Sequence, residues 1–166
     1  MKIVVHDLSG PEIERFLDDH IQEMRDVTPP DSKHALDIDG LRMDNVTFWV
    51  VLDDGGVIIG TGALKRLGPV EGEIKSMRTT PERKRSGIAS ALLNHIVDYA
   101  RQQGLQRLSL ETGSTPFFEP ARQLYLKHGF WECGPFGEYT LDPYSQFFTL
   151  NLAANDASHC TEDGCV

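Results

Sequence analysis

The feature of the sequence that most constrains the fold is a change of pattern halfway along the chain. Residues 72–79 are predicted as a β-strand, and after Pro81 apolar residues recur at helical spacing until Gly104 can end the helix. Residues 105–112 again have the pattern of a strand. A strand, a helix and a strand in succession favour a mixed α/β domain.

Shorter signals on either side of this unit complete the order of elements. Residues 46–52 are rich in β-branched and aromatic side chains, residues 53–56 supply turn chemistry, and residues 57–67 continue as a second strand of a hairpin. The predicted order is β-α-β-β-β-α-β-α-β-β. The other elements are a strand at 2–5, a helix that starts near Ser9 and Glu12, a helix from 117–119 to just before Gly129, and strands at 130–134 and 144–152.

Length, charge and cysteine content limit the class of protein. The 166 residues suffice for one domain, which we assign to residues 1–152, followed by a polar, flexible tail at residues 153–166. The 16 basic and 25 acidic side chains give a formal net charge of −9, which argues against a nucleic-acid partner. Three scattered cysteines, short apolar runs and six histidines without metal-ligand spacing predict a cytoplasmic protein with no membrane segment and no metal.

A basic loop joins the central strand to the central helix. Residues 75–85 carry five basic side chains and one acidic side chain, and Gly87 precedes the first turn of the helix. The unpaired N–H groups of a helix N-terminus attract anions, and small residues such as Gly87 and Ala89 let phosphate oxygens approach the backbone. The loop lacks the Gly-Lys-Ser/Thr ending of a Walker A motif. The sequence therefore predicts a site for a phosphorylated ligand at this helix.

Three segments together carry a resemblance to a known family. They are residues 73–78, the loop at 85–89 with the helical residues 91–93, and residues 121–125 followed by Gly129 and Phe130. In this order they resemble the GNAT superfamily of acetyl-CoA-dependent N-acyltransferases, and within it a branch of small bacterial acetyltransferases. The similarity spans roughly residues 34–152.

The resemblance implies a fold, a reaction and a co-substrate. The fold is a central, mixed and mostly antiparallel sheet flanked by helices. The reaction is transfer of an acetyl group from acetyl-CoA to the amine of a small molecule, an amino acid or a peptide, with both substrates bound together. A homodimer is common in the family.

The resemblance also implies where CoA binds. The pyrophosphate would lie on the backbone amides of residues 85–89, and the pantetheine arm would pair with the backbone of residues 77–79. Lys84 stands where the family usually has arginine or glutamine, so it offers charge without a planar fork. The expected cofactor-binding residues are Met77, Arg78, Thr79, Lys84, Arg85, Ser86, Gly87, Ile88, Ala89 and Ser90.

The chemistry of the reaction, together with the resemblance, indicates the catalytic residues. An alkyl amine has a pKa of about 10, so a base or an ordered water must remove its proton near neutral pH. Glu73 lies where histone-modifying members of the superfamily use a glutamate base, and Glu111 is the alternative base. Tyr125 matches the tyrosine that protonates the departing sulfur in many members, and a backbone N–H near Met77 would meet the oxyanion.

Several alternatives stay open from the sequence. His34 and Phe136 are candidates, with Glu111, for contact with the acceptor. A non-catalytic acyl-CoA sensor and a module that binds nucleotide phosphates would both use the same basic loop. The acceptor, the choice of base, the oligomeric state and the role of the cysteines in the tail are not determined by the sequence.

Overall fold

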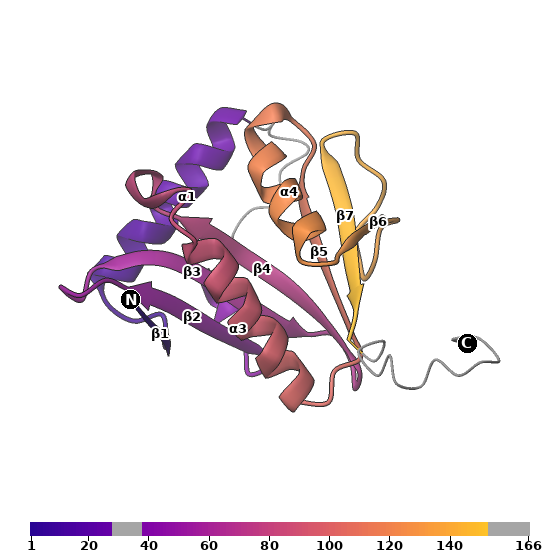
Figure 1. Ribbon diagram of the computed structural model, residues 1–166, viewed down its shortest axis with the longest axis horizontal. Coiled ribbons are helices and arrows are strands. Elements are labelled where there is room, and N and C mark those ends of the chain that lie inside the picture. The colour runs from indigo at the N-terminus through magenta and orange to yellow at the C-terminus, as the bar shows by residue number, and fades with distance from the viewer. Residues whose placement is uncertain (28–37, 153–166) are drawn as a thin grey trace.

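The computed structural model describes residues 1–27 and 38–152, which build one seven-stranded sheet of order β1-β2-β3-β4-β5-β7-β6 (Figure 1). All neighbouring strands are antiparallel except β4 and β5, which are parallel. The strands are β1 (Lys2–Val5), β2 (Val46–Leu52), β3 (Ile58–Arg66), β4 (Glu71–Thr79), β5 (Arg107–Gly113), β6 (Trp131–Cys133) and β7 (Ser145–Asn151). The helices are α1 (Pro11–Val27), α2 (Ile38–Leu41), α3 (Ile88–Gln102) and α4 (Glu119–Lys127), with 3-10 turns η2 (Pro81–Arg83) and η3 (Pro116–Phe118).

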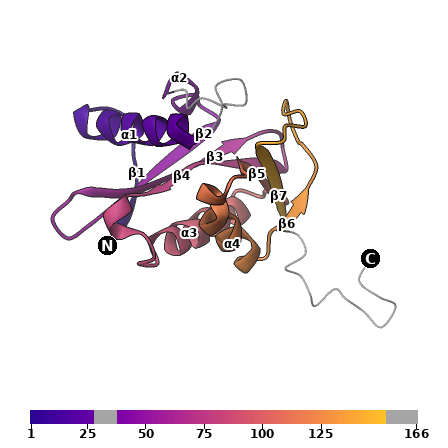
Figure 2. The ribbon, with the colours of Figure 1, turned by 90° about the horizontal axis from the view of Figure 1, so that it is seen from above.

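Helices cover both faces of the sheet, with α1 and α2 on one side and α3 and α4 on the other (Figure 2). Successive side chains of a strand point to opposite faces, so the buried β2 residues alternate between two cores. Phe48 and Val50 pack with α1, whereas Trp49 and Val51 join the core beneath α3. The predicted mixed α/β fold is confirmed, and so is its element order apart from the additional helix α2.

The local signals acted as expected in the β2–β3 hairpin. The Asp53 carboxylate accepts hydrogen bonds from the backbone N–H groups of Gly55 and Val57, both at 2.9 Å. Gly56 adopts a φ of +81°, which favours glycine. The sequence of the turn therefore determines where β2 ends and β3 begins.

Two details near the N-terminus differ from the prediction. Helix α1 begins at Pro11 rather than at Ser9, because the Ser9 side chain bonds to Asp7 and the Gly10 carbonyl accepts the first helical N–H, that of Glu14. The short helix α2 was not predicted, since its four residues are too few to show a helical period.

The central feature of the sheet is the parting of β4 and β5. Their parallel pairing runs from Glu71 opposite Arg107 to Ile74 opposite Leu110 and then stops, although β4 continues to Thr79. A bulge in β4 accompanies the parting, because Ser76 has a φ of +57° and the β3–β4 register shifts at this point. Beyond Ile74, one edge of β4 is therefore free of β5.

None of the helices in the described ranges is long and apolar enough to cross a membrane. The expected tail at residues 153–166 lies outside the described residues.

Candidate active site

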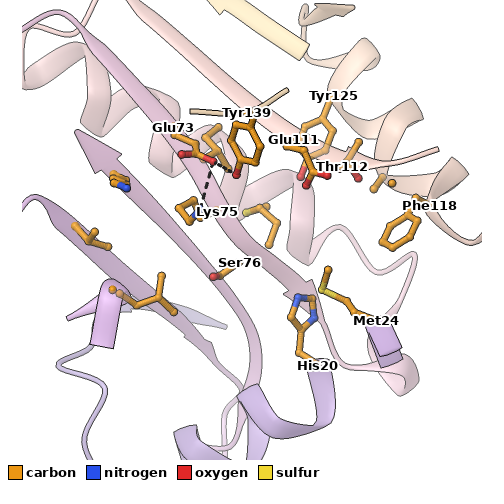
Figure 3. A pocket seen from close by; sticks show the side chains of 18 of the residues that line it. His20, Met24, Glu73, Lys75, Ser76, Glu111, Thr112, Phe118, Tyr125 and Tyr139 are labelled. Carbon is orange, nitrogen blue, oxygen red and sulfur yellow. Dashed lines mark hydrogen bonds and ion pairs between the residues drawn. The ribbon is translucent and has the colours of Figure 1, made fainter. Parts of the chain in front are cut away.

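A cavity of about 460 Å³ lies where β4 and β5 part (Figure 3). Side chains from α1, β4, β5, α4 and the loop before β7 line it. In the close-up, Glu73, Lys75 and Tyr139 gather at one end, and His20, Met24 and Phe118 lie at the other. The parting of the strands thus opens a space in the middle of an otherwise continuous sheet.

Glu73 is a buried carboxylate at one end of the cavity, with 4% of its surface exposed. The Tyr139 hydroxyl donates a hydrogen bond to Glu73 Oε2 at 2.7 Å, and Lys75 Nζ lies 3.4 Å from the same oxygen. Both contacts involve Oε2, which leaves Oε1 for a ligand. A buried carboxylate requires hydrogen-bond and charge partners of this kind, and Tyr139 and Lys75 supply them.

Tyr125 projects from α4 into the cavity and is almost fully buried. Its ring packs against Phe130, with centroids 5.7 Å apart, and against Phe148 at 6.3 Å. Burial, and secondly the negative charge of Glu111, raise the pKa of the Tyr125 phenol well above its ordinary value. Tyr125 therefore keeps its proton at neutral pH and can act as a proton donor.

Glu111 lines the cavity from β5, on the other side of the parting from Glu73 (Figure 3). The Ser145 hydroxyl donates to Glu111 Oε2 at 2.6 Å, which holds the carboxylate at the β7 side. Tyr139 is sensitive to both carboxylates, because burial, the charge of Glu73 and the hydrogen bond to Glu73 raise the pKa of its phenol, with a smaller effect from Glu111. The cavity thus holds two carboxylates and two protonated tyrosines.

The N-terminus of α3 has the geometry of an anion site. Arg85 and Gly87 have φ values of +64° and +84°, so the loop turns sharply before Ile88. No side chain caps the helix, and a Cβ added at Gly87 would meet nothing within 4 Å. The first N–H groups of α3, which include those of Ile88 and Ala89, can therefore receive an anion.

Some predicted cofactor residues have other partners. The Arg78 side chain points to α1, where it donates to the Phe16 carbonyl at 3.1 Å and pairs with Glu23 at 3.2 Å. Only its backbone is therefore available to a ligand along β4. Lys84 Nζ lies 4.0 Å from Glu23 Oε2 and 5.3 Å from the centroid of the Phe117 ring. Ser86 bonds to the Arg83 carbonyl.

Ser90 and Thr79 complete the predicted cofactor set. The Ser90 hydroxyl lies 2.8 Å from His128 Nε2, which ties the first turn of α3 to the end of α4. Thr79 ends β4 and pairs with Gly60 of β3, next to the loop that leads to α3. Met77 lines the cavity itself. The predicted residues therefore follow one path from the free edge of β4 to the N-terminus of α3.

The candidates for acceptor contact had different outcomes. Glu111 lines the cavity, whereas Phe136 does not and instead packs against Tyr139, with ring centroids 5.1 Å apart. Phe136 therefore supports the tyrosine that reaches Glu73. His34 lies outside the described residues.

Sequence reasoning left several lining residues of the site unassigned, among them Lys65, Lys75 and His20. Lys75 was part of the family motif but was not assigned to the cavity, where it pairs with Glu73. His20 of α1 also lines the cavity, and burial, with a smaller effect from Arg78, lowers its pKa to about 4. The signal for Lys75 was its two-residue spacing from Glu73 on one strand, which places both side chains on one face. His20 gave no such signal, because α1 is distant from β4 in sequence.

Comparison with known proteins decides the family. The model of the Acetyltransferase (GNAT) family matches residues 13–130. The chain belongs to the GNAT family of acetyltransferases. It is similar to the uncharacterized N-acetyltransferase YedL of Escherichia coli (strain K12), with 47% identity over 93% of this chain and 96% of that protein. It is also similar to the uncharacterized N-acetyltransferase YsnE of Bacillus subtilis (strain 168), with 45% identity over 92% of this chain and 100% of that protein.

Solved structures show the same GNAT fold. A GNAT family acetyltransferase from Elizabethkingia anophelis, with acetyl-CoA bound, superposes with a TM-score of 0.66 at 18% identity, over 90% of this chain and 97% of that chain. The family assignment makes this chain an acyltransferase. Among the described residues, no group of three or more histidine, cysteine, aspartate and glutamate side chains could hold a metal ion.

Proposed function

We propose that this GNAT protein transfers the acetyl group of acetyl-CoA to the amine of a small molecule, an amino acid or a peptide while both substrates are bound. The observation that carries the proposal is the cavity between β4 and β5, with the buried carboxylate of Glu73 on β4 and the buried phenol of Tyr125 on α4. A base and an acid in one enclosed space are what transfer from a thioester to an amine requires.

The geometry fits acetyl-CoA, which would supply the reactive thioester. The backbone of residues 77–79 is unpaired with β5 and can bond to an extended arm as an added strand would. The uncapped N-terminus of α3, with open space before Gly87, suits the pyrophosphate. The bound acetyl-CoA in the Elizabethkingia anophelis acetyltransferase supports the same assignment.

Glu73 is the proposed base. Its Oε1 would accept the proton of the acceptor amine, directly or through one water, while Tyr139 and Lys75 hold Oε2. The amine nitrogen then bonds to the thioester carbonyl carbon. Glu111, which faces the cavity from β5, is the alternative base. One oxygen of Glu111 is engaged by Ser145, just as one oxygen of Glu73 is engaged by Tyr139 and Lys75, and the family resemblance makes Glu73 the preferred base.

Tyr125 is the proposed acid. As the carbon–sulfur bond breaks, the Tyr125 phenol would give its proton to the departing sulfur, which leaves CoA as a thiol. A backbone N–H near Met77, next to the bulge, would donate to the carbonyl oxygen as that oxygen gains negative charge. No covalent acyl-enzyme is needed in this sequence.

The test is an assay of CoA-thiol release over a panel of amines, amino acids and aminoglycosides. Wild-type protein should release thiol and form the acetylated amine with at least one acceptor. Glu73→Gln should lower kcat about 100-fold, the loss typical for removal of a general base. Glu14→Gln, a matched change at an exposed position of α1, should leave kcat within twofold.

Two outcomes would contradict the proposal. Tight binding of acetyl-CoA without thiol release across the panel would favour the non-catalytic sensor. A rise in thermal stability with ATP but not with CoA would favour a module for nucleotide phosphates.

A further inference from the structure

The end of the cavity where Glu73 lies contains two lysines on one face of the sheet. Lys65 of β3 lies directly opposite Glu73 of β4, and Lys75 lies opposite Ala63. Residues that are opposite each other, or two apart on one strand, point to the same face. Lys65, Glu73 and Lys75 therefore share one face, and all three line the cavity.

The charges at this end do not cancel. Lys75 pairs with Glu73 at 3.4 Å, so that lysine and that carboxylate neutralise each other. Lys65 forms no ion pair with any residue in the ranges 1–27 and 38–152, and its side chain is half-buried. Leu41 and Val46 add apolar lining nearby, which strengthens electrostatic attraction. Glu111, the second carboxylate of the cavity, lies on β5 across the parting, so Lys65 is the positive charge left at the Glu73 end to meet a ligand.

The pattern of charges selects among acceptors. The lining holds two lysines against two carboxylates, so it offers no net negative charge to attract a polycation such as an aminoglycoside or a polyamine. A molecule with one amine and one carboxylate complements both signs, because its amine can approach Glu73 while its carboxylate approaches Lys65. Opposite residues of antiparallel strands have Cβ atoms about 5 Å apart, so the amine and the carboxylate must be close neighbours in the ligand.

We propose that the acceptor is an amino carboxylate, such as an α-amino acid, whose carboxylate binds Lys65 at the end of the cavity where Glu73 takes the amine proton. This inference rests on the proposed function and narrows its substrate class. The remaining lining agrees, since the Tyr139 and Tyr144 side chains enclose this cavity with apolar rings. Lys65 determines specificity, and Glu73 carries the chemistry.

The test compares matched acceptors. Each of the common amino acids is offered with its carboxamide and with its decarboxylated amine, at saturating acetyl-CoA, and kcat/KM is measured from thiol release. For the best acceptor, the free acid should exceed its amide and its amine by at least about tenfold. Lys65→Met should lower the ratio of acid to amide about tenfold, whereas Lys65→Arg should retain most of it. Lys2→Met, an exposed lysine of β1, should leave the ratio unchanged.

A binding measurement separates this inference from the proposed function. The N-acetyl derivative of each amino acid and its amide are titrated calorimetrically into protein saturated with CoA, and the acid should bind about tenfold more tightly. Preference for the acid in binding, without any turnover, would support this inference and contradict the proposed function. Two outcomes would overturn this inference and leave the proposed function standing. One is a kcat/KM for amides and amines equal to that for acids. The other is an equal loss of kcat/KM for acid and amide in Lys65→Met.

Discussion

Burial determines the protonation of single residues in this cavity. Tyr125 is buried in the core and Tyr139 is half-buried, and both lie near carboxylates, so burial and charge favour the neutral phenols. Glu73 is also buried but receives a hydrogen bond and a lysine. The same surroundings therefore keep the tyrosines as proton donors and provide Glu73 with the partners that a buried carboxylate needs.

Tyr125 gives the first prediction at this scale. Because the pKa of its phenol is raised above its ordinary value of 10, the acid stays protonated and kcat should show no falling limb up to pH 10. Tyr125→Phe should lower kcat about 100-fold while the KM for acetyl-CoA changes less than threefold. A pH–rate profile of both proteins checks this. A wild-type kcat that already declines at pH values lower than 9 would refute the role of Tyr125 as the acid. An unchanged kcat in Tyr125→Phe would refute it as well.

His20 gives a prediction about stability. Its pKa in the folded protein is about 4, below the ordinary value of 6.5, so the unfolded chain binds a proton first as pH falls. The contribution of neutral His20 to the stability of the fold is therefore complete above pH 6.5 and is lost as pH falls towards 4. Between pH 6.5 and pH 4, the free energy of unfolding of the wild type should fall by up to about 3 kcal/mol more than that of His20→Phe. Urea titrations at several pH values measure the difference, and equal losses in both proteins would contradict it.

The family resemblance, rather than any local pattern, singled out Glu73 and Tyr125, with Glu111 at the end of the next strand as the alternative base. All three side chains line the cavity, and their catalytic roles stay predictions. The loop before β7 has no period that separates Phe136 from Tyr139, three residues further on, so its pattern does not say which of the two rings lines the cavity. Lys65 could be grouped with Glu73 and Lys75 only once the β3–β4 register was known.

At the scale of elements, the buried Arg78 side chain links β4 to α1. Arg78 lies over the Phe16 ring at 4.7 Å, donates to the Phe16 carbonyl and pairs with Glu23. These contacts cross from the free edge of β4 to the helix that carries His20 and Met24 of the cavity wall. Arg78 therefore links the site to the core beneath α1.

Replacement of Arg78 should show this link. Arg78→Met removes the hydrogen bonds and leaves the Glu23 carboxylate without this partner, so we expect a loss of about 2 to 3 kcal/mol in the free energy of unfolding. Arg15→Met, an exposed change on α1, should cost less than about 0.5 kcal/mol. Urea unfolding of both variants provides the measurement. Equal stability of the two variants would show that Arg78 does not anchor the helix.

No local pattern of the sequence predicts the parting of β4 and β5. The bulge that accompanies it lies at Ser76, a residue type that gives no signal for a left-handed conformation. The close approach of Gly62 in β3 explains why the strands fit there, because a Cβ at this glycine would come within 2.7 Å of Met77 Sδ. Such contacts depend on three elements at once, and no single stretch of sequence encodes them.

At the scale of the whole molecule, the arrangement of charge agrees with the proposed function. The chain has a formal net charge of −9, yet five of its basic residues gather between residues 75 and 85. Much of this cluster lies around the approach to α3, and the rest faces the cavity or α1. An acidic protein with one concentrated basic region suits a small phosphorylated ligand rather than a nucleic acid.

The most direct test of the account follows the acetyl group itself. Acetyl-CoA labelled in its acetyl group is mixed in a single turnover with wild-type protein and the best acceptor from the amine panel, and the label is located by mass spectrometry. Direct transfer predicts label on the acceptor amine at the rate of CoA release, and no labelled protein when the acceptor is left out. Label that accumulates on the protein, or CoA release without a labelled acceptor, would contradict transfer through the cavity between β4 and β5.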